Sequence, residues 1–181
     1  TLPALPVKGR GAVSNRPGRY ELGGRPLEDD GWTLPAAAGT EDDLPPLRTV
    51  VLEDSSRSVI SRNQSPDVPF DQSINPYRGC EHGCIYCFAR PTHAYLGMSP
   101  GVDFESRLFA KPNAAALLAK ELSAPGYVPK VIAMGTNTDP YQPLEKKMRI
   151  TRSILEVLRE FRHPVAIVTK NNLVTRDLDL L

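Results

Sequence analysis

The sequence predicts an α/β protein in which short β-strands alternate with α-helices from about residue 70 onward. Two compact apolar runs, "KVIAMGT" at 130–136 and "PVAIVTK" at 164–170, are typical of strands buried on both faces of a parallel sheet. Between them, "RITRSILEVLREF" at 149–161 has apolar residues at helical spacing. Three β-then-α units joined by short connections indicate a parallel sheet or part of a (β/α) barrel.

The first fifty residues predict no regular element. They hold seven prolines and seven glycines without a sustained helical or strand period, which is typical of a loop-rich or disordered segment. We place this segment at 1–54 and a core domain at 55–181. A solvated tail is the favoured interpretation of the segment. The alternative is an arm that contacts phosphate or nucleic acid through its basic residues, which are Lys8, Arg10, Arg16 and Arg19.

The first β-then-α unit follows that segment. "SINPY" at 73–77 predicts a short extended run that leads straight into the cysteines, and "RLFAK" at 107–111 predicts a further extended piece. After Pro112, "NAAALLAKEL" at 113–122 is rich in good helix formers, and Asn113 is a suitable N-cap.

The later units complete the pattern. The helix predicted at 149–161 places one apolar stripe in the core, formed by Ile150, Ile154, Leu155, Leu158 and Phe161. "TRDLDLL" at 175–181 predicts the start of another helix. Because a helix begins in the last residues, we expect the chain to be the N-terminal piece of a longer protein.

Composition limits the classes of partner. The 181 residues are 40% hydrophobic, which is sufficient for one core, and 22 basic residues balance 21 acidic ones to a formal charge of +1. No overall field therefore indicates nucleic acid or an anionic membrane. No apolar run approaches the roughly 20 residues of a membrane-spanning helix, and no secretion signal is recognisable. We expect a cytoplasmic protein with no membrane partner.

All three cysteines lie in "GCEHGCIYC" at 79–87, where Cys80, Cys84 and Cys87 have the spacing C-x3-C-x2-C. A clustered, odd number of thiols indicates a metal in a reducing compartment rather than a disulfide framework. Structural zinc normally takes four protein ligands, whereas a cubane iron–sulfur cluster can be held by three and leave one iron open.

Zinc remains the alternative for this loop, with His82 or His93 as the fourth ligand. The chain would then be a zinc-binding module that binds nucleic acid or acts as a scaffold. Otherwise both histidines are surface residues or lie behind the ligands. Arg78 and Arg90 flank the loop, where they could raise the potential of a cluster, bind phosphate or simply be solvated.

Longer phrases around these cysteines carry a family resemblance. "NPYRGCEHGCIYCFARPTHAY", "GTNTDPYQPLE" and "VTK" together resemble radical S-adenosylmethionine (SAM) enzymes, and are similar to a bacterial subgroup related to spore photoproduct lyase. The likeness covers about residues 55–181. It implies that Cys80, Cys84 and Cys87 bind a 4Fe–4S cluster, and that the open iron chelates the amino and carboxylate groups of SAM. An electron supplied by a donor such as flavodoxin or ferredoxin then cleaves SAM to methionine and a 5′-deoxyadenosyl radical, which takes hydrogen from an unknown substrate.

The resemblance also implies SAM-binding residues, although it identifies no catalytic residue. Tyr86 and Phe88 are candidates for the adenine side. The end of the second strand faces the SAM amino group, where this chain has Thr136, Asn137, Thr138 and Asp139. Lys170 matches a lysine offered to the SAM carboxylate, which is a favourable pairing of charges. The alternatives are that Asp139 only caps a turn and that Lys170 is a solvated charge.

Two features depart from the family pattern. The superfamily barrel commonly has six βα units, and only three are recognisable here. A photoproduct lyase also relies on a further cysteine after the second strand, where "GTNTDP" has no thiol. We therefore expect about half a barrel, and a reaction other than repair of DNA photoproducts.

Overall fold

The computed structural model describes residues 11–12 and 48–181. The chain divides into two compact units. One consists of Thr1–Val50 with Gly79–Leu108, and the other of Val51–Arg78 with Phe109–Leu181. The basic arm that the sequence suggests, Lys8, Arg10, Arg16 and Arg19, lies outside the described residues.

A four-stranded sheet organises the second unit, in the order β2-β3-β6-β7. Its strands are β2 (Ile60–Arg62), β3 (Gln72–Ile74), β6 (Ile132–Met134) and β7 (Val165–Ile167). β3, β6 and β7 run parallel to one another, and β2 is antiparallel to β3. The predicted α/β class is thus confirmed. The sheet is mixed, since three of its strands are parallel and β2 is antiparallel, and it is open within the described part of the chain.

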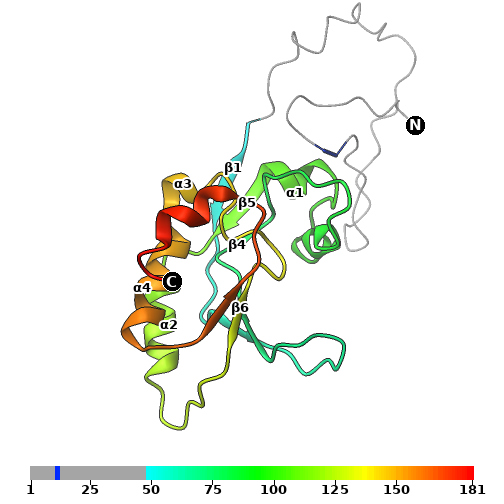
Figure 1. Ribbon diagram of the computed structural model, residues 1–181. Helices are drawn as coiled ribbons and strands as arrows, with labels where there is room; N and C mark the ends of the chain where they lie inside the picture. The colour runs from blue at the N-terminus through cyan, green and yellow to red at the C-terminus, as the bar shows by residue number, and fades with distance from the viewer. Residues whose placement is uncertain (1–10, 13–47) are drawn as a thin grey trace, which may run out of the picture. The chain divides into compact units, whose positions relative to one another are not determined.

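Helices α2 (Ala114–Leu122) and α4 (Ile150–Glu160) lie side by side against this sheet (Figure 1). The strand residues in the shared core sit in register, with Ile74 beside Met134 and Met134 beside Ile167. The neighbouring register row consists only of small residues, Ser73, Ala133 and Ala166. Because side chains alternate across a strand, the bulky row faces the helices and the small row lies on the other face of the sheet.

The helix predicted from apolar spacing is α4. Ile150, Ile154, Leu155 and Leu158 are buried, whereas Phe161 is 37% exposed at the C-cap and does not belong to the core stripe. Full burial of a leucine or isoleucine side chain stabilises a fold by about 1.5–3 kcal/mol. Asn113 occupies the N-cap position of α2 as predicted, but its side chain makes no capping hydrogen bond.

The run "SINPY" is not one extended element. β3 ends at Ile74, and the chain turns through Asn75 and Pro76 before β4 (Tyr77–Arg78). Pro76 has no backbone N–H and cannot continue a ladder, which explains the break. β4 instead pairs antiparallel with β5 (Arg107–Ala110), the extended piece predicted at 107–111.

A second sheet has the order β1-β5-β4, with β1 spanning Val50–Glu53. β1 lies inside the segment that the sequence predicts to be loop-rich, so that prediction is wrong at its C-terminal end. The sequence also gives no sign of β2, because strands of three or four residues are too short to show a period.

β7 differs from its predicted burial on both faces. Ala166 is exposed, and Val165 and Ile167 are only half-buried, because β7 is the last strand of the sheet within the described chain. The helix predicted at 175–181 begins earlier, as the 3-10 helix η3 (Asn172–Asp177). The side chain of Asn171 caps it by accepting a hydrogen bond of 3.0 Å from the amide N of Leu173.

Glu145 is fully buried at the start of the short helix α3 (Glu145–Met148). Its carboxylate accepts hydrogen bonds from the Tyr77 hydroxyl, the backbone N of Thr151 at 2.9 Å and the Arg176 guanidinium at 2.8 Å. Burial, together with the nearby Glu145 charge, raises the pKa of Tyr77 far above its usual range. Tyr77 therefore stays protonated and acts as a donor that joins β4 to α3.

Asp177 is also fully buried and fixes η3 to α4. It accepts hydrogen bonds from Arg152 at 2.8 Å and from both Nε and Nη2 of Arg176. Burial alone would raise the pKa of this carboxyl, but the hydrogen bonds from the two arginines outweigh burial and lower it. The end of the described chain is thus held by a buried ionic cluster.

The first unit contains the 3-10 helix η2 (Arg90–Leu96) and the helix α1 (Val102–Ser106). Cys80, Ala89 and Phe104 form a small buried cluster in this unit, with Cys87 packed against it. Across residues 11–12 and 48–181, no helix is long and apolar enough to cross a membrane.

Gly135, directly after β6, is expected to be intolerant of any side chain. Its φ is +94°, and a Cβ there would lie 2.0 Å from the carbonyl oxygen of Val168. Gly126 has a φ of +79° but no atom within 4 Å of the corresponding position. Gly126→Ala should cost about 1–2 kcal/mol from backbone conformation alone. Gly135→Ala should cost about 1–3 kcal/mol more from the clash, measured by urea unfolding. Equal losses in the two variants would contradict the close approach.

The Asp177 cluster predicts how stability depends on pH. Because the folded state lowers the pKa of Asp177, the unfolded state binds more protons around pH 4 and below. The stabilisation is therefore present above about pH 4 and lost as the pH falls further. In urea unfolding between pH 7 and 3, Asp177→Asn should be less stable at pH 7 and should depend less on pH than the wild type. Asp67→Asn, at an exposed position, is the control. If only the Asp67→Asn variant changed the pH dependence of the free energy of unfolding, the role given to Asp177 would be contradicted.

Candidate functional site

The three thiols lie on one loop, residues 79–90, which we call the cysteine loop. Cys80 is 7% exposed, Cys84 and Cys87 are half-buried, and none of them is in a disulfide. All three cysteines are thus outside any disulfide, and they differ in how far they are exposed to solvent.

Backbone contacts give the cysteine loop its shape. The backbone N of Cys80 donates to the carbonyl of Phe104 at 2.9 Å, and the backbone N of Cys87 donates to the carbonyl of Cys84 at 3.2 Å. Gly79 has a φ of +76°, and a Cβ there would lie 2.7 Å from the Phe104 oxygen. Glycine is therefore required before Cys80 by both conformation and space.

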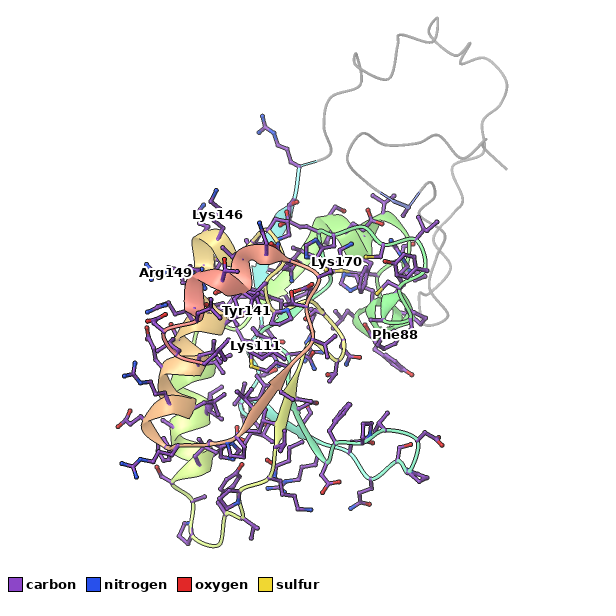
Figure 2. All side chains as sticks on the ribbon, viewed as in Figure 1. Phe88, Lys111, Tyr141, Lys146, Arg149 and Lys170 are labelled. Carbon is purple, nitrogen blue, oxygen red and sulfur yellow. The ribbon has the colours of Figure 1, made fainter. Side chains whose placement is uncertain are left out.

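Large side chains of the loop point outward. Tyr86 is 82% exposed and Phe88 is 78% exposed, and Figure 2 shows the Phe88 ring standing away from the backbone. Ile85 and Tyr95 are similarly exposed, at 76% and 74%. The two residues suggested for an adenine ring are thus on the accessible side of the loop.

The histidines of the zinc alternative have different environments. His93 is fully buried, its Nε2 lies 2.9 Å from the carbonyl of Arg107, and its ring packs edge-on against Phe104. Burial lowers the pKa of His93, although the Arg107 carbonyl opposes that effect. His82 is half-buried. The Nε2 atom of His93 thus already has a backbone partner.

The two flanking arginines are not equivalent. Arg78 pairs with Asp54 at 2.7 Å, and its side chain is 44% exposed. Arg90 has a side chain only 12% exposed and forms an ion pair with the fully buried carboxylate of Glu105. The solvated alternative thus describes Arg78 better than Arg90.

The donor chemistry of the loop fits a soft metal centre. Among the described residues, no three His, Cys, Asp or Glu side chains are gathered as a metal site. Three thiols within eight residues, none of them in a disulfide, are nevertheless the kind of ligand that an iron–sulfur cluster uses. Glycines with positive φ let the backbone turn directly before Cys80 and directly before Cys84. Cys80, Cys84 and Cys87 could hold such a group if the metal itself draws the thiols together.

In the second unit, polar side chains join the carboxyl ends of β3 and β6. Asn75, just after β3, exchanges hydrogen bonds with the Thr136 hydroxyl at 3.2 and 3.3 Å. The Asn75 side-chain oxygen also accepts from the backbone N of Asn137 at 3.0 Å. One amide side chain thus fixes the segment that leaves β6.

Asp139 joins the ends of β6 and β7 in the same way. It accepts hydrogen bonds from the backbone N of Tyr141 at 2.8 Å, the hydroxyl of Thr169 at 2.6 Å and the backbone N of Lys170 at 3.0 Å. The contact with Tyr141 is the local turn that the alternative interpretation of Asp139 describes. The contacts with Thr169 and Lys170 add a link between strands.

The residues suggested for SAM therefore differ in accessibility. Thr138 is buried and donates from its hydroxyl to the carbonyl of Tyr77 at 3.1 Å. Thr136 and Asp139 are half-buried within the links just described, whereas Asn137 and Lys170 are exposed. All of them follow the carboxyl ends of parallel strands, which is where open α/β sheets bind ligands. We call Asn75, Thr136–Asp139, Thr169 and Lys170 the strand-end cluster.

The sequence alone did not single out Asn75, Thr169 or Glu105. Asn75 and Thr169 carry a usable signal, since each is a polar residue next to the end of a recognisable strand. Glu105 carries no such signal, because its partners are distant in the sequence.

Comparison with known proteins finds relatives over part of the chain. It is 46% identical over 114 residues to uncharacterized protein Rv2578c of Mycobacterium tuberculosis, a match that covers 63% of this chain and 34% of that protein. The same figures hold for uncharacterized protein Mb2609c of Mycobacterium bovis. Uncharacterized protein MJ0683 of Methanocaldococcus jannaschii is 33% identical over 107 residues, covering 59% of this chain and 38% of that protein.

The chain spans about a third of the length of the curated relatives that it matches. No protein-family model and no solved structure matches it significantly. A mixed α/β fold with a partly parallel sheet is therefore the class that the structure defines.

Asp139 is expected to be important for stability because it links two strand ends. Asp139→Ala removes the acceptor of three hydrogen bonds and should lower the free energy of unfolding by about 1–3 kcal/mol. Thr169→Val removes the hydroxyl that donates to Asp139 and accepts from the backbone N of Asn171, and should cost about 1–2 kcal/mol. Urea unfolding measures both, and an Asp139→Ala variant as stable as the wild type would refute the link.

Proposed function

We propose that this chain is part of a radical SAM enzyme, in which Cys80, Cys84 and Cys87 hold a 4Fe–4S cluster and SAM is cleaved reductively. The observation that carries the proposal is the cysteine loop. It presents three thiols, none of them in a disulfide, in the spacing C-x3-C-x2-C, and glycines of positive φ directly precede Cys80 and Cys84. Three thiolates complete the coordination of three irons and leave the fourth for another ligand.

The backbone of the loop supports this role. Cys80 is anchored to Phe104, and the turn from Cys84 to Cys87 is closed by its own hydrogen bond. Anchoring through the backbone lets the sulfur atoms serve as metal ligands without loss of the loop's shape. Because thiolate ligands and metal commonly organise each other, we expect the thiols to move together when iron binds.

Several of the residues that the resemblance suggests for SAM are accessible. Tyr86 and Phe88 offer exposed rings for the adenine, and aromatic faces are favourable stacking partners. Lys170 offers an ammonium group to the SAM carboxylate. Asn137 is an accessible partner for the SAM amino group, and the links of Thr136, Thr138 and Asp139 would fix its position.

The cluster, when bound and reduced, would supply the electron that cleaves SAM to methionine and a 5′-deoxyadenosyl radical. The chain's own residues would hold SAM and keep it oriented. A donor such as flavodoxin or ferredoxin would supply the electron, and thiols that form no disulfide favour a cytoplasmic location. The proposal names no substrate. Nucleic acid is a partner in the zinc alternative.

We also propose that β3, β6 and β7 are part of a radical SAM barrel. They are parallel neighbours, and helices α2 and α4 pack on one face as in a (β/α) barrel. β7 ends the sheet with an exposed edge, and such an edge is suited to pair with a further strand. The relatives are about three times as long as the match, which leaves room for further units.

Anaerobic reconstitution tests the cluster. The chain should take up iron and sulfide to give a brown protein, with a reduced-cluster electron paramagnetic resonance signal that changes on adding SAM. Cys84→Ser should lose most of the iron, because only two thiolates remain. In the whole protein, dithionite and SAM should yield 5′-deoxyadenosine, and Cys84→Ala should abolish it. A colourless protein with stoichiometric zinc would refute the proposal.

His82→Ala separates the cluster from the zinc alternative. If the three thiols hold iron and sulfide, this variant should keep the wild-type iron content. If His82 completes a zinc site, the variant should instead lose bound zinc. Elemental analysis of the two proteins, prepared side by side, distinguishes the outcomes.

A further inference from the structure

Glu105 is a fully buried carboxylate on α1 that connects three parts of the first unit. It accepts hydrogen bonds from the backbone N of Gly11 at 3.0 Å and of Ala12 at 2.9 Å, and it forms an ion pair with Arg90. A buried charge is expensive unless it is paired and hydrogen-bonded. These three contacts meet that requirement, so the Glu105 carboxylate binds the backbone of Gly11 and Ala12.

Arg90 holds the carbonyl of Cys84. Its Nε and Nη2 atoms donate to the Cys84 oxygen at 3.0 and 2.9 Å, and its Nη1 donates to the carbonyls of Pro100 and Gly101 at 3.3 and 3.2 Å. The guanidinium also lies 5.4 Å from the centre of the Phe104 ring. Only a planar fork with five N–H donors can reach all these partners, so lysine would not replace it.

Gly11 fits directly against the residue that precedes Cys84. A Cβ on Gly11 would lie 1.7 Å from the carbonyl oxygen of Gly83. A Cβ on Gly83 would in turn lie 3.0 Å from the backbone N of Gly11 and 3.1 Å from Glu105 Oε2. The two backbones approach so closely that glycine is needed on both sides.

We infer that Arg90 and Glu105 are positioning residues for Cys84, and that Gly11–Ala12 is a strap that binds Glu105 and lies against Gly83 of the cysteine loop. Arg90 fixes the backbone of Cys84, and Glu105 holds Arg90 and the strap together. Gly11 and Ala12 thus contribute to the support of the cysteine loop. The functional role of Cys84 rests on the proposed function, whereas the contacts of Arg90, Glu105 and Gly11–Ala12 do not depend on metal.

The test uses the chain without iron and has two measurements. Hydrogen exchange of the Gly11 and Ala12 amides reports the strap. The rates at which iodoacetamide alkylates the three cysteines, resolved by mass spectrometry, report the position of Cys84. In the wild type, both amides should exchange more slowly than in an unstructured peptide of the same sequence.

Glu105→Gln keeps the shape of the side chain but removes its charge. At least one of the two amides should then exchange about 10- to 100-fold faster, as expected for the loss of a charge-assisted hydrogen bond. Arg90→Lys should speed alkylation of Cys84 relative to Cys80 while the amides stay protected. Gly11→Ala should release the strap and leave the Arg90 contact in place. A general loss of structure would change both amide exchange and thiol alkylation. The loss of one positioning contact would change only one of the two.

Gly97→Ala is the matched control, because Gly97 has a φ of +69° in the same unit but no atom within 4 Å of a Cβ. It should leave the amide protection and the relative thiol rates unchanged. If Glu105→Gln fails to fold, Gly11→Ala still tests the strap. Unprotected amides in the wild type, or equal acceleration of all three thiols in Arg90→Lys, would overturn the inference. Failure of the same protein to bind iron would overturn the proposed function alone.

Discussion

The cysteine loop is held in place by hydrogen bonds to its backbone, and this constraint governs the first unit. The three thiols take no part in a disulfide. The loop is fixed instead by the Cys80 amide on the Phe104 carbonyl and by the Arg90 guanidinium on the Cys84 carbonyl. Such contacts stabilise one backbone path without using the sulfur atoms. Removing Arg90 would leave the buried Glu105 charge without its cation, so the loop and its support are energetically coupled.

In the second unit, hydrogen bonds to the backbone likewise hold the strand-end cluster. Asn75 and Asp139 direct their side chains to neighbouring backbone and hydroxyl groups, and they thereby fix the segments that follow β6 and β7. Asn137 and Lys170, which those segments carry, remain exposed. The strand ends therefore combine half-buried residues that hold the backbone with exposed residues that are accessible. These partly buried hydrogen bonds restrain the chain at the strand ends, and a preorganised edge would lose less entropy if a ligand bound there.

The sequence predicted those strands and helices whose burial leaves a pattern of apolar residues along the chain itself. The apolar run at β6 and the helical stripe of α4 were recognisable because burial imposes a period on the residues themselves. The burial of β7 was predicted wrongly because it depends on which strand lies beside it. The break in "SINPY" was missed although Pro76 signals it.

The cysteine spacing and the polar strand ends were likewise visible in the sequence, and they suggested the candidate site. The Glu105 contacts were not, because Gly11 lies 94 residues away in the chain and no local period connects the two. Long-range pairing of a buried charge is decided by the fold. The close approach of Gly11 to Gly83 belongs to the same class, since glycine-rich sequence alone indicates only a flexible segment.

If three thiolates hold a four-iron cluster, one iron is left open to SAM. Mössbauer spectroscopy of the protein reconstituted with ⁵⁷Fe distinguishes this iron from the other three. About one quarter of the iron signal should change when SAM is added, since one iron in a four-iron cluster lacks a thiolate. A four-iron spectrum indifferent to SAM, or a protein that binds no iron, would contradict it.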